Sequence, residues 1–294
     1  AWNAMNTVVT LIAADPIADT CVDAVCKALG GEPVWLAEGI ACDIASNLPP
    51  EAAKSAAHKI AGAAALDIAA QPVAGRRKRL LVADMESTII ENEMLDELAD
   101  ELGLRAEIAA ITTRAMRGEL DFEGAIRERV AMLADLEEEA LVRSEAKIRI
   151  MAGAPELVAT MKAYGASCAL VSGGFDFYTR RIRERLGFDT DQANRLEIRD
   201  GRLTGAVIPP ILGRDAKKAA LEHLAAKHGI SVADAITVGD GANDLDMLAT
   251  AGTGVAFRAK PLVAEAARFR VEFSDLRALL YIQGYTDQQI REPV

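Results

Sequence analysis

The chain has 294 residues, of which 51% are hydrophobic and 26% are charged, and its formal net charge is −11; this size suits about two globular domains with sizeable cores. The acidic balance argues against a nucleic-acid-binding protein, because phosphate backbones require a basic face, and no segment is apolar for long enough to span a membrane. The first cation is Lys27, so the start of the chain lacks the basic segment of a secretory signal, and we expect a cytoplasmic protein.

The first 70 residues predict a small α+β domain. The elements expected from apolar alternation and turn residues are strands at 6–13, 33–38, 40–46 and 66–70, with helices at 16–29 and after Pro50. This βαββαβ order is that of a ferredoxin-like plait, and it resembles the ACT domain, a small-ligand sensor. The charged stretch 71–78 contains Pro and Gly, as domain boundaries do. We therefore assign residues 1–72 to an ACT-like domain.

From residue 79 onward, short apolar strands alternate with helices. The expected strands are residues 80–84, 167–172, 235–240 and 254–257. Such alternation predicts a doubly wound, Rossmann-like parallel sheet. A charged helical stretch at about 91–150 interrupts the pattern directly after the first strand, as a lid would. Asp200-Gly201 lies between β-prone flanks and predicts a hairpin.

Two carboxylates follow the first of these strands. Asp84 ends the apolar run that starts at Leu80, and Glu86 stands two residues later. Open α/β sheets place their ligands at this end of a strand. A carboxylate can accept a phosphoryl group when a divalent cation offsets the charge repulsion, and a second acid nearby can exchange protons with the leaving group and with water. By itself, Asp84 would be read as a turn former or helix cap.

Two later segments add candidate anion-binding groups. Ser172-Gly173-Gly174 follows an apolar run and precedes a predicted helix, so its hydroxyl and N–H groups would point at an anion. Lys217 lies at the start of another predicted helix and supplies a cation. By themselves, the first segment is an ordinary strand-to-helix turn and the second is a solvated lysine, which is what we expect of the adjacent Lys218.

The string from Gly239 to Asp244 indicates a metal site most strongly. Asp240, Asn243 and Asp244 place oxygen donors at short spacing after a strand, and Mg²⁺ prefers oxygen ligands with few protein carboxylates. A calcium loop is a poorer interpretation, because the alternating ligands and terminal Glu of an EF-hand are missing. Together the four segments supply a nucleophile, an anion cradle, a fixed cation and metal ligands, which are the parts of a phosphoryl-transfer site.

These motifs, in this order and spacing, resemble the haloacid dehalogenase (HAD) superfamily of phosphotransferases, and within it the phosphoserine phosphatases most closely. The resemblance covers about residues 79–285 and extends into the lid. It implies a HAD domain at 79–294 with a helical cap at about 91–150. It also implies a Mg²⁺-dependent enzyme that hydrolyses O-phospho-L-serine to L-serine and phosphate through an aspartyl-phosphate, the last step of serine biosynthesis.

The resemblance assigns roles to individual residues. Asp84 is the nucleophile and Glu86 the acid/base. The metal ligands that it implies are Asp84, the backbone carbonyl of Glu86, Asp240 and Asp244. The residues that it assigns to substrate binding are Glu93, Met116, Phe122, Arg129, Ser172, Gly173, Lys217 and Asn243. It further suggests an amino-acid effector at the N-terminal domain and a homodimer.

The chain departs from the family at Glu86, where the family usually has Asp. The extra methylene moves the acid/base carboxyl by about a bond length, which can alter the rate. Two alternatives stay open. Another HAD phosphatase, acting on a phosphosugar or phosphohistidinol, would share the core motifs without needing Glu93 and Arg129, and an amino-acid sensor would have lost turnover through Glu86. A response-regulator receiver is set aside, because it has neither the lid nor the Ser-Gly-Gly segment.

Overall fold

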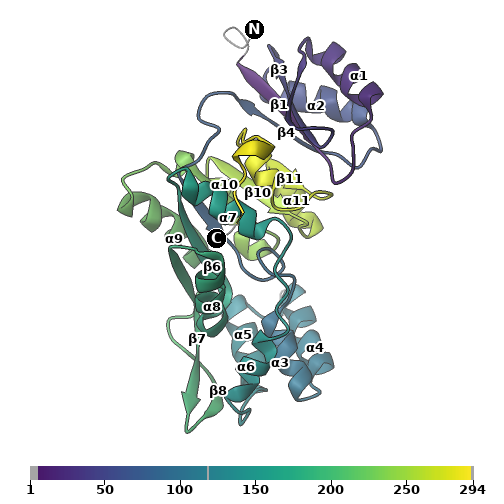
Figure 1. Cartoon of the computed structure of the whole chain (residues 1–294). Helices are drawn as coiled ribbons and strands as arrows, with labels where there is room; N and C mark the ends of the chain where they lie inside the picture. The colour runs from purple at the N-terminus through teal and green to yellow at the C-terminus, as the bar shows by residue number, and fades with distance from the viewer. Residues whose placement is uncertain (1–5, 118, 293–294) are drawn as a thin grey trace.

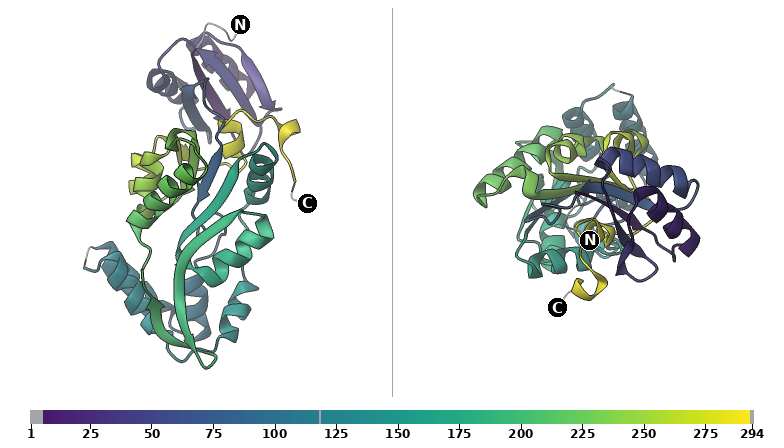
Figure 2. Two further views of the ribbon diagram at one scale, coloured as in Figure 1. Left: turned by 90° about the vertical axis from the view of Figure 1, so that its left-hand side faces the viewer. Right: turned by 90° about the horizontal axis from the view of Figure 1, so that it is seen from above.

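The computed structural model describes residues 6–117 and 119–292, and its parts follow one another along a long axis (Figure 1). A four-stranded sheet with two helices lies at one end, a seven-stranded sheet in the middle, and a group of helices at the other end. A perpendicular view shows the same succession (Figure 2). None of the helices in the described ranges is both long and apolar enough to cross a membrane.

The first sheet has the βαββαβ order that the sequence predicts. Its elements are β1 (Thr7–Ile12), α1 (Asp19–Leu29), β2 (Pro33–Ala37), β3 (Ala41–Ser46), α2 (Pro50–Ala61) and β4 (Asp67–Pro72). The strands lie in the order β2-β3-β1-β4, and all neighbours are antiparallel. Helix α1 begins at Asp19 rather than at Pro16, because Ala18 is extended and the N–H of Ile17 donates to Gly39 O at 2.7 Å. The likeness to an ACT domain stays a prediction.

Both faces of this sheet are buried. One face packs against α1 and α2 through apolar side chains such as Val9, Leu11 and Ile44. The other face shares a core with helix α12 (Ala278–Ile282) near the end of the chain, to which Ile12 and Ala69 contribute. Because apolar surface is buried between them, the two sheets are held together by the hydrophobic effect and not only by the linker.

The second sheet is the predicted doubly wound sheet. Its strands are β5 (Leu80–Ala83), β6 (Ser167–Phe175), β7 (Thr190–Arg199), β8 (Arg202–Ile208), β9 (Ala235–Gly239), β10 (Thr253–Phe257) and β11 (Phe269–Val271). Their order is β11-β10-β9-β5-β6-β7-β8, and only β7 and β8 are antiparallel neighbours. The sequence predicted β5, β6, β9, β10 and the β7–β8 hairpin; the short edge strand β11 was not predicted.

Helices cover both faces of this sheet. Strand residues alternate between the faces, so Leu81 packs in one core and Leu80 in the other. The helices on the first side are α7 (Ala154–Ala163), α8 (Asp176–Leu186) and α12, and those on the second are α9 (Arg214–Lys227), α10 (Leu245–Thr250) and α11 (Pro261–Ala266). Strand β5 lies between β6 and β9. The chain thus turns to opposite sides of β5, and the crevice at such a switch point is where ligands bind.

The helical group is formed by the stretch between β5 and β6, as predicted. Its helices are α3 (Met94–Glu101), α4 (Arg105–Met116), α5 (Phe122–Ala131) and α6 (Glu139–Glu145). A β-bridge between Ile90 and Ile150 joins the two chain segments that enter and leave it. The β7–β8 hairpin is tied to the same group, because Glu137 and Arg202 form a second bridge and a salt bridge at 3.0 Å. This group is therefore a cap supported from two places on the sheet.

Asp67, at the start of β4, fastens the first sheet to the second. Its carboxylate is buried and accepts hydrogen bonds from the backbone N–H groups of residues 272, 273 and 274, the shortest at 2.7 Å. Gln71 adds a hydrogen bond from its amide to Ile282 O at 2.6 Å. A buried carboxylate needs such donors, because an unpaired charge is costly in the interior.

We expect Asp67→Ala to lower the free energy of unfolding by about 1.5–3 kcal/mol, the usual contribution of hydrogen bonds to a charged group. Urea denaturation of the full chain measures this change. Asp23→Ala, at an exposed position of α1, is the control and should have little effect. Equal stability of the two variants would show that Asp67 does not hold the interface.

Candidate active site

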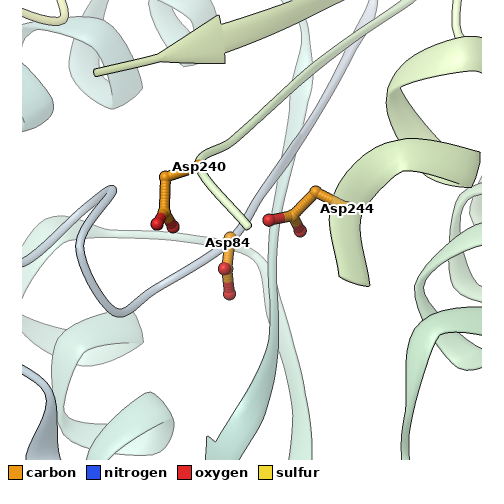
Figure 3. Close-up of side chains that lie close together, drawn as sticks. All are labelled: Asp84, Asp240 and Asp244. Atoms are coloured by element: carbon orange, nitrogen blue, oxygen red, sulfur yellow. The ribbon is translucent and has the colours of Figure 1, made fainter. Parts of the chain in front are cut away.

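Three aspartates meet at the carboxyl edge of the second sheet (Figure 3). Asp84 follows β5, Asp240 follows β9, and Asp244 lies in the short turn before α10. All three are buried, and one carboxylate oxygen from each lies within 4.8 Å of the others. The segments carrying Asp84 and Asp240 come together because β5 and β9 are parallel neighbours, and the N–H of Asp84 donates to Val238 O at 3.0 Å.

Lys217 is the cation of this cluster. It projects from the first turns of α9 and is 2% exposed, so almost no water reaches it. Its ammonium lies 2.8 Å from Asp84 Oδ1 and 2.6 Å from Asp244 Oδ1. These carboxylates raise the pKa of Lys217 against the opposing effect of burial. By contrast, Lys218 is exposed and lies 3.8 Å from Glu222, as expected of a surface lysine.

The cluster holds more negative charge than one lysine can balance. Burial, followed by the nearby Asp244, raises the pKa of Asp84 well above its usual value. The same two causes raise the pKa of Asp240 to about 6. Closely spaced buried carboxylates repel one another in this way unless a further cation joins them. Oxygen donors crowded within this distance suit a divalent metal ion, and the residues present therefore fit one.

Glu86 lies apart from that cluster, beside the cap. Its Oε1 accepts a hydrogen bond from the N–H of Met94, the first residue of α3, at 2.8 Å. A Cβ placed on Gly174 would lie 2.7 Å from its Oε2, so a larger residue there would displace the Glu86 carboxyl. Burial and the neighbouring Glu93 raise the pKa of Glu86 to about 8, against the lowering effect of the Met94 N–H and Arg129. A pKa raised in this way favours the protonated carboxyl, which is the form that can donate a proton.

The Ser-Gly-Gly segment differs in form from the predicted turn. Strand β6 continues through it to Phe175, with irregular pairing to β7 between Val171 and Phe175. The Ser172 hydroxyl is buried and accepts from the N–H of Gly174 at 2.9 Å. The amide of Asn243 lies beside Gly173. Ser172, Gly173 and Asn243 thus lie together next to the carboxylates, although Gly174 gives its N–H to Ser172 and not to the open site.

The cap brings its predicted residues to the same edge. Glu93 is exposed and accepts from the Ser87 hydroxyl at 2.6 Å. Arg129 is partly buried; burial lowers its pKa, and Glu86, Glu93 and Asp96 oppose that change. Phe122 lies between Gly173 and Gly213, with ring atoms 3.1 and 3.2 Å from where their Cβ atoms would be. The side chain of Met116 lies outside the part of the chain that the structure describes.

The structure adds a residue that the sequence did not indicate. Asn194, in β7, is fully buried, and its amide donates to Gly173 O at 2.8 Å. Its Oδ1 accepts from the N–H of Leu212 at 2.6 Å. Asn194 therefore links the backbone at Gly173 to the backbone at Leu212, and the ring of Phe122 lies between these two segments. No motif marks Asn194, and only the pairing of β6 with β7 brings it into position.

Fold and site together place an acidic cluster under a helical cap, at the carboxyl edge of a doubly wound, mostly parallel sheet. A sequence profile described as haloacid dehalogenase-like hydrolase matches residues 81–249. The chain belongs to this family.

Named relatives agree with that assignment. The chain is 42% identical over 247 residues to a phosphoserine phosphatase of Streptomyces coelicolor, a match that covers 83% of this chain but only 60% of that protein. It is also 42% identical over 205 residues to a phosphoserine phosphatase of Methanocaldococcus jannaschii, covering 70% of this chain and 97% of that one. A solved structure of a probable phosphoserine phosphatase from Vibrio cholerae matches with a TM-score of 0.80 at 32% identity, covering 98% of this chain and 89% of that one.

We expect Asp240→Asn to stabilise the metal-free protein at pH 8. The pKa of Asp240 is about 6 in the folded state, above the value of about 3.9 for an unfolded chain, so the fold disfavours the charged form. The resulting loss in the free energy of unfolding is absent below pH ~4 and grows as the pH rises. Above the folded-state pKa of about 6 it reaches its full value of about 2–3 kcal/mol. Urea denaturation in EDTA at pH 4 and pH 8 measures the difference.

Two comparisons complete this test. Asp215→Asn, at an exposed position near the start of α9, should leave stability unchanged at both pH values. Mg²⁺ should stabilise the wild-type chain more than Asp240→Asn, because a ligand that binds only the folded state stabilises it. If Asp240→Asn were less stable than wild type at pH 8 without metal, the inference that repulsion among the three aspartates destabilises the metal-free fold would be wrong.

Proposed function

We propose that the chain is a Mg²⁺-dependent phosphoserine phosphatase, which hydrolyses O-phospho-L-serine to L-serine and phosphate in the last step of serine biosynthesis. One observation carries the proposal: a buried lysine paired with Asp84 and Asp244 lies under a cap that presents Arg129 and Glu93 beside Glu86. The first group of residues suits a phosphoryl group, and the cap supplies opposite charges for an amino acid. The names of the relatives support the same substrate.

Asp84 would attack phosphorus and form an aspartyl-phosphate, releasing the seryl oxygen. Glu86 would protonate that oxygen, which its pKa of about 8 permits at neutral pH. The same carboxylate would then take a proton from the water that hydrolyses the aspartyl-phosphate. Lys217, Ser172, Gly173 and Asn243 would bind the phosphoryl oxygens. Asp84, the Glu86 carbonyl, Asp240 and Asp244 would hold Mg²⁺, which offsets the charge repulsion between nucleophile and phosphate.

The cap would select the amino-acid part of the substrate. Arg129 would bind the carboxylate and Glu93 the ammonium, because each offers the opposite charge. Phe122, with Met116, would exclude water from the reacting groups. Phosphosugars carry neither charged group, so this pair favours phosphoserine over them.

The same proposal includes the division of the chain. We assign residues 1–72 to the N-terminal ACT-like domain and 79–294 to the phosphatase domain, with the cap at about 91–150. The composition of the linker and the separate sheets support this division. An amino-acid effector at the N-terminal domain and a homodimer are parts of the proposal that the family resemblance alone supports.

Phosphate release from L-phosphoserine, with and without Mg²⁺, tests the function. Wild type should be active only with Mg²⁺. Asp84→Asn should lose all turnover while its thermal unfolding stays cooperative, because Asp84 would be the residue that carries the phosphoryl group. Asp215→Asn controls for the loss of one acidic group and should stay active. Turnover by Asp84→Asn at the wild-type rate would exclude this mechanism. If wild type released no phosphate either with or without Mg²⁺, the amino-acid sensor would be the better interpretation.

Arg129→Ala should raise KM for phosphoserine by roughly 10- to 150-fold, since a charge-assisted hydrogen bond contributes about 1.5–3 kcal/mol. Hydrolysis of p-nitrophenyl phosphate, which lacks the amino acid's charged groups, should change little. Arg127→Ala is the matched control, because Arg127 lies on the same helix but is exposed and paired with Glu123. Equal losses on both substrates would mean that Arg129 is structural.

A further inference from the structure

Strand β6 bulges where it carries the Ser-Gly-Gly segment. Its pairing with β7 is regular up to Val171 and resumes at Phe175, so three residues of β6, 172–174, stand opposite one residue of β7. Bulges disrupt the ladder locally and are common next to active sites, where they redirect the chain. Within this bulge, the carbonyl of Gly173 accepts a hydrogen bond from a side chain, the amide of Asn194, at 2.8 Å.

The same amide holds a second segment, which leads into α9. Its Oδ1 accepts from the N–H of Leu212 at 2.6 Å, and its Nδ2 donates to Leu212 O at 3.3 Å. Among the described residues, no other hydrogen bond reaches either backbone group of Leu212. Asn194 is fully buried, and both of its amide hydrogens go to backbone carbonyls. The amide therefore fixes the distance between the two segments.

Phe122 of the cap lies in a slot between these segments. The walls of the slot are Gly173 and Gly213, the residue that follows Leu212. Different atoms of the ring lie 3.1 and 3.2 Å from where the Cβ atoms of the two glycines would be. Closely packed groups transmit small displacements to one another. The slot therefore accepts the ring only while its walls keep their present separation.

We propose that Asn194 is a positioning residue, which sets the width of this slot and thereby allows Phe122 to close the cap over the phosphoryl group. Its hydrogen bonds go to the backbone of Gly173 and Leu212, so it acts through those segments and not on the substrate. The inference rests on the proposed phosphatase function, in which Gly173 binds the phosphoryl group and Phe122 excludes water.

A double-mutant cycle between Asn194 and Phe122 tests this role. Asn194→Asp keeps the size of the side chain but replaces both N–H donors with an oxygen that repels the two carbonyls. We expect kcat/KM for phosphoserine to fall by roughly 10- to 100-fold, the effect of a misplacement of about 1 Å. In a Phe122→Ala background, which lacks the ring, Asn194→Asp should lower kcat/KM by no more than about twofold. Equal losses in the two backgrounds would overturn the proposal.

Gln283→Glu is the matched control, because it makes the same change from amide to carboxyl at a fully buried position just after α12. The amide of Gln283 donates to Leu279 O at 3.0 Å, and its oxygen accepts from the N–H of Lys78 at 3.0 Å. Both variants should unfold at a lower temperature than wild type, but kcat/KM of folded Gln283→Glu should stay within about twofold of wild type. Equal losses of kcat/KM would mean that loss of a buried amide, and not the slot, is the cause.

Gly213→Ala narrows the slot from the other wall without removing a hydrogen bond, and it decides the matter if Asn194→Asp does not fold. The added methyl group would lie 3.2 Å from the ring of Phe122, so kcat/KM should fall. The same substitution should have almost no effect in the Phe122→Ala background. A loss of equal size with and without the ring would contradict the slot.

Amide hydrogen exchange separates this proposal from the proposed function, because it needs no turnover. In Asn194→Asp, residues 122–126 and 211–214 should exchange faster than in wild type, whereas exchange in α1 should be unchanged. If wild type released no phosphate but these two segments responded together, the phosphatase assignment would fail and the slot would stand. If residues 122–126 exchanged at the wild-type rate in the variant, the slot would be wrong, even where turnover was lost.

Discussion

The buried ammonium of Lys217 is the interaction on which the site depends. It is almost inaccessible to water, and it contacts Asp84 and Asp244 at 2.8 and 2.6 Å. A buried ion pair contributes little net stability, because both charges lose their contact with water. Removing one partner is strongly destabilising, because the other charge is then left buried and unpaired. Strands β5 and β9 and helix α9 must therefore keep their relative positions for the charges to be tolerated. The apolar core on that face of the sheet, which joins β5 to α9 and α10, supplies this rigidity.

The cap is closed over the cluster through a few specific contacts. Phe122 fits closely between Gly173 and Gly213, where an added Cβ would lie 3.1 and 3.2 Å from ring atoms. Tyr178 and Ser144, both fully buried, share a hydrogen bond of 2.6 Å that joins α8 to α6. Since α8 follows the Ser-Gly-Gly segment after one residue, this hydrogen bond couples the position of the cap to that segment.

Much of this arrangement could be predicted from the sequence, because it is encoded locally. Apolar runs mark β5, β6 and β9, and the acidic strings directly follow two of those strands, so their convergence follows from parallel pairing alone. The features that were missed depend on partners far along the chain. Asp67 binds residues 205 to 207 positions away, and Asn194 acts only through backbone groups of Gly173 and Leu212. A single polar residue gives no periodic pattern, and its partner is fixed only by the packing of whole elements.

Glu86 shows how a departure from the family pattern is accommodated. The longer side chain reaches the N-terminus of α3, where Oε1 accepts the N–H of Met94, and the space for it exists because Gly174 has no side chain. A protonated carboxyl has one hydrogen to donate, and an oxygen that accepts from a backbone N–H is the acceptor of the pair. In a protonated Glu86 the hydrogen would therefore be on Oε2, the oxygen nearer to Gly174. The longer side chain thus links the segment after β5 to the first residue of α3 in the cap, and the missing side chain of Gly174 leaves it room to do so.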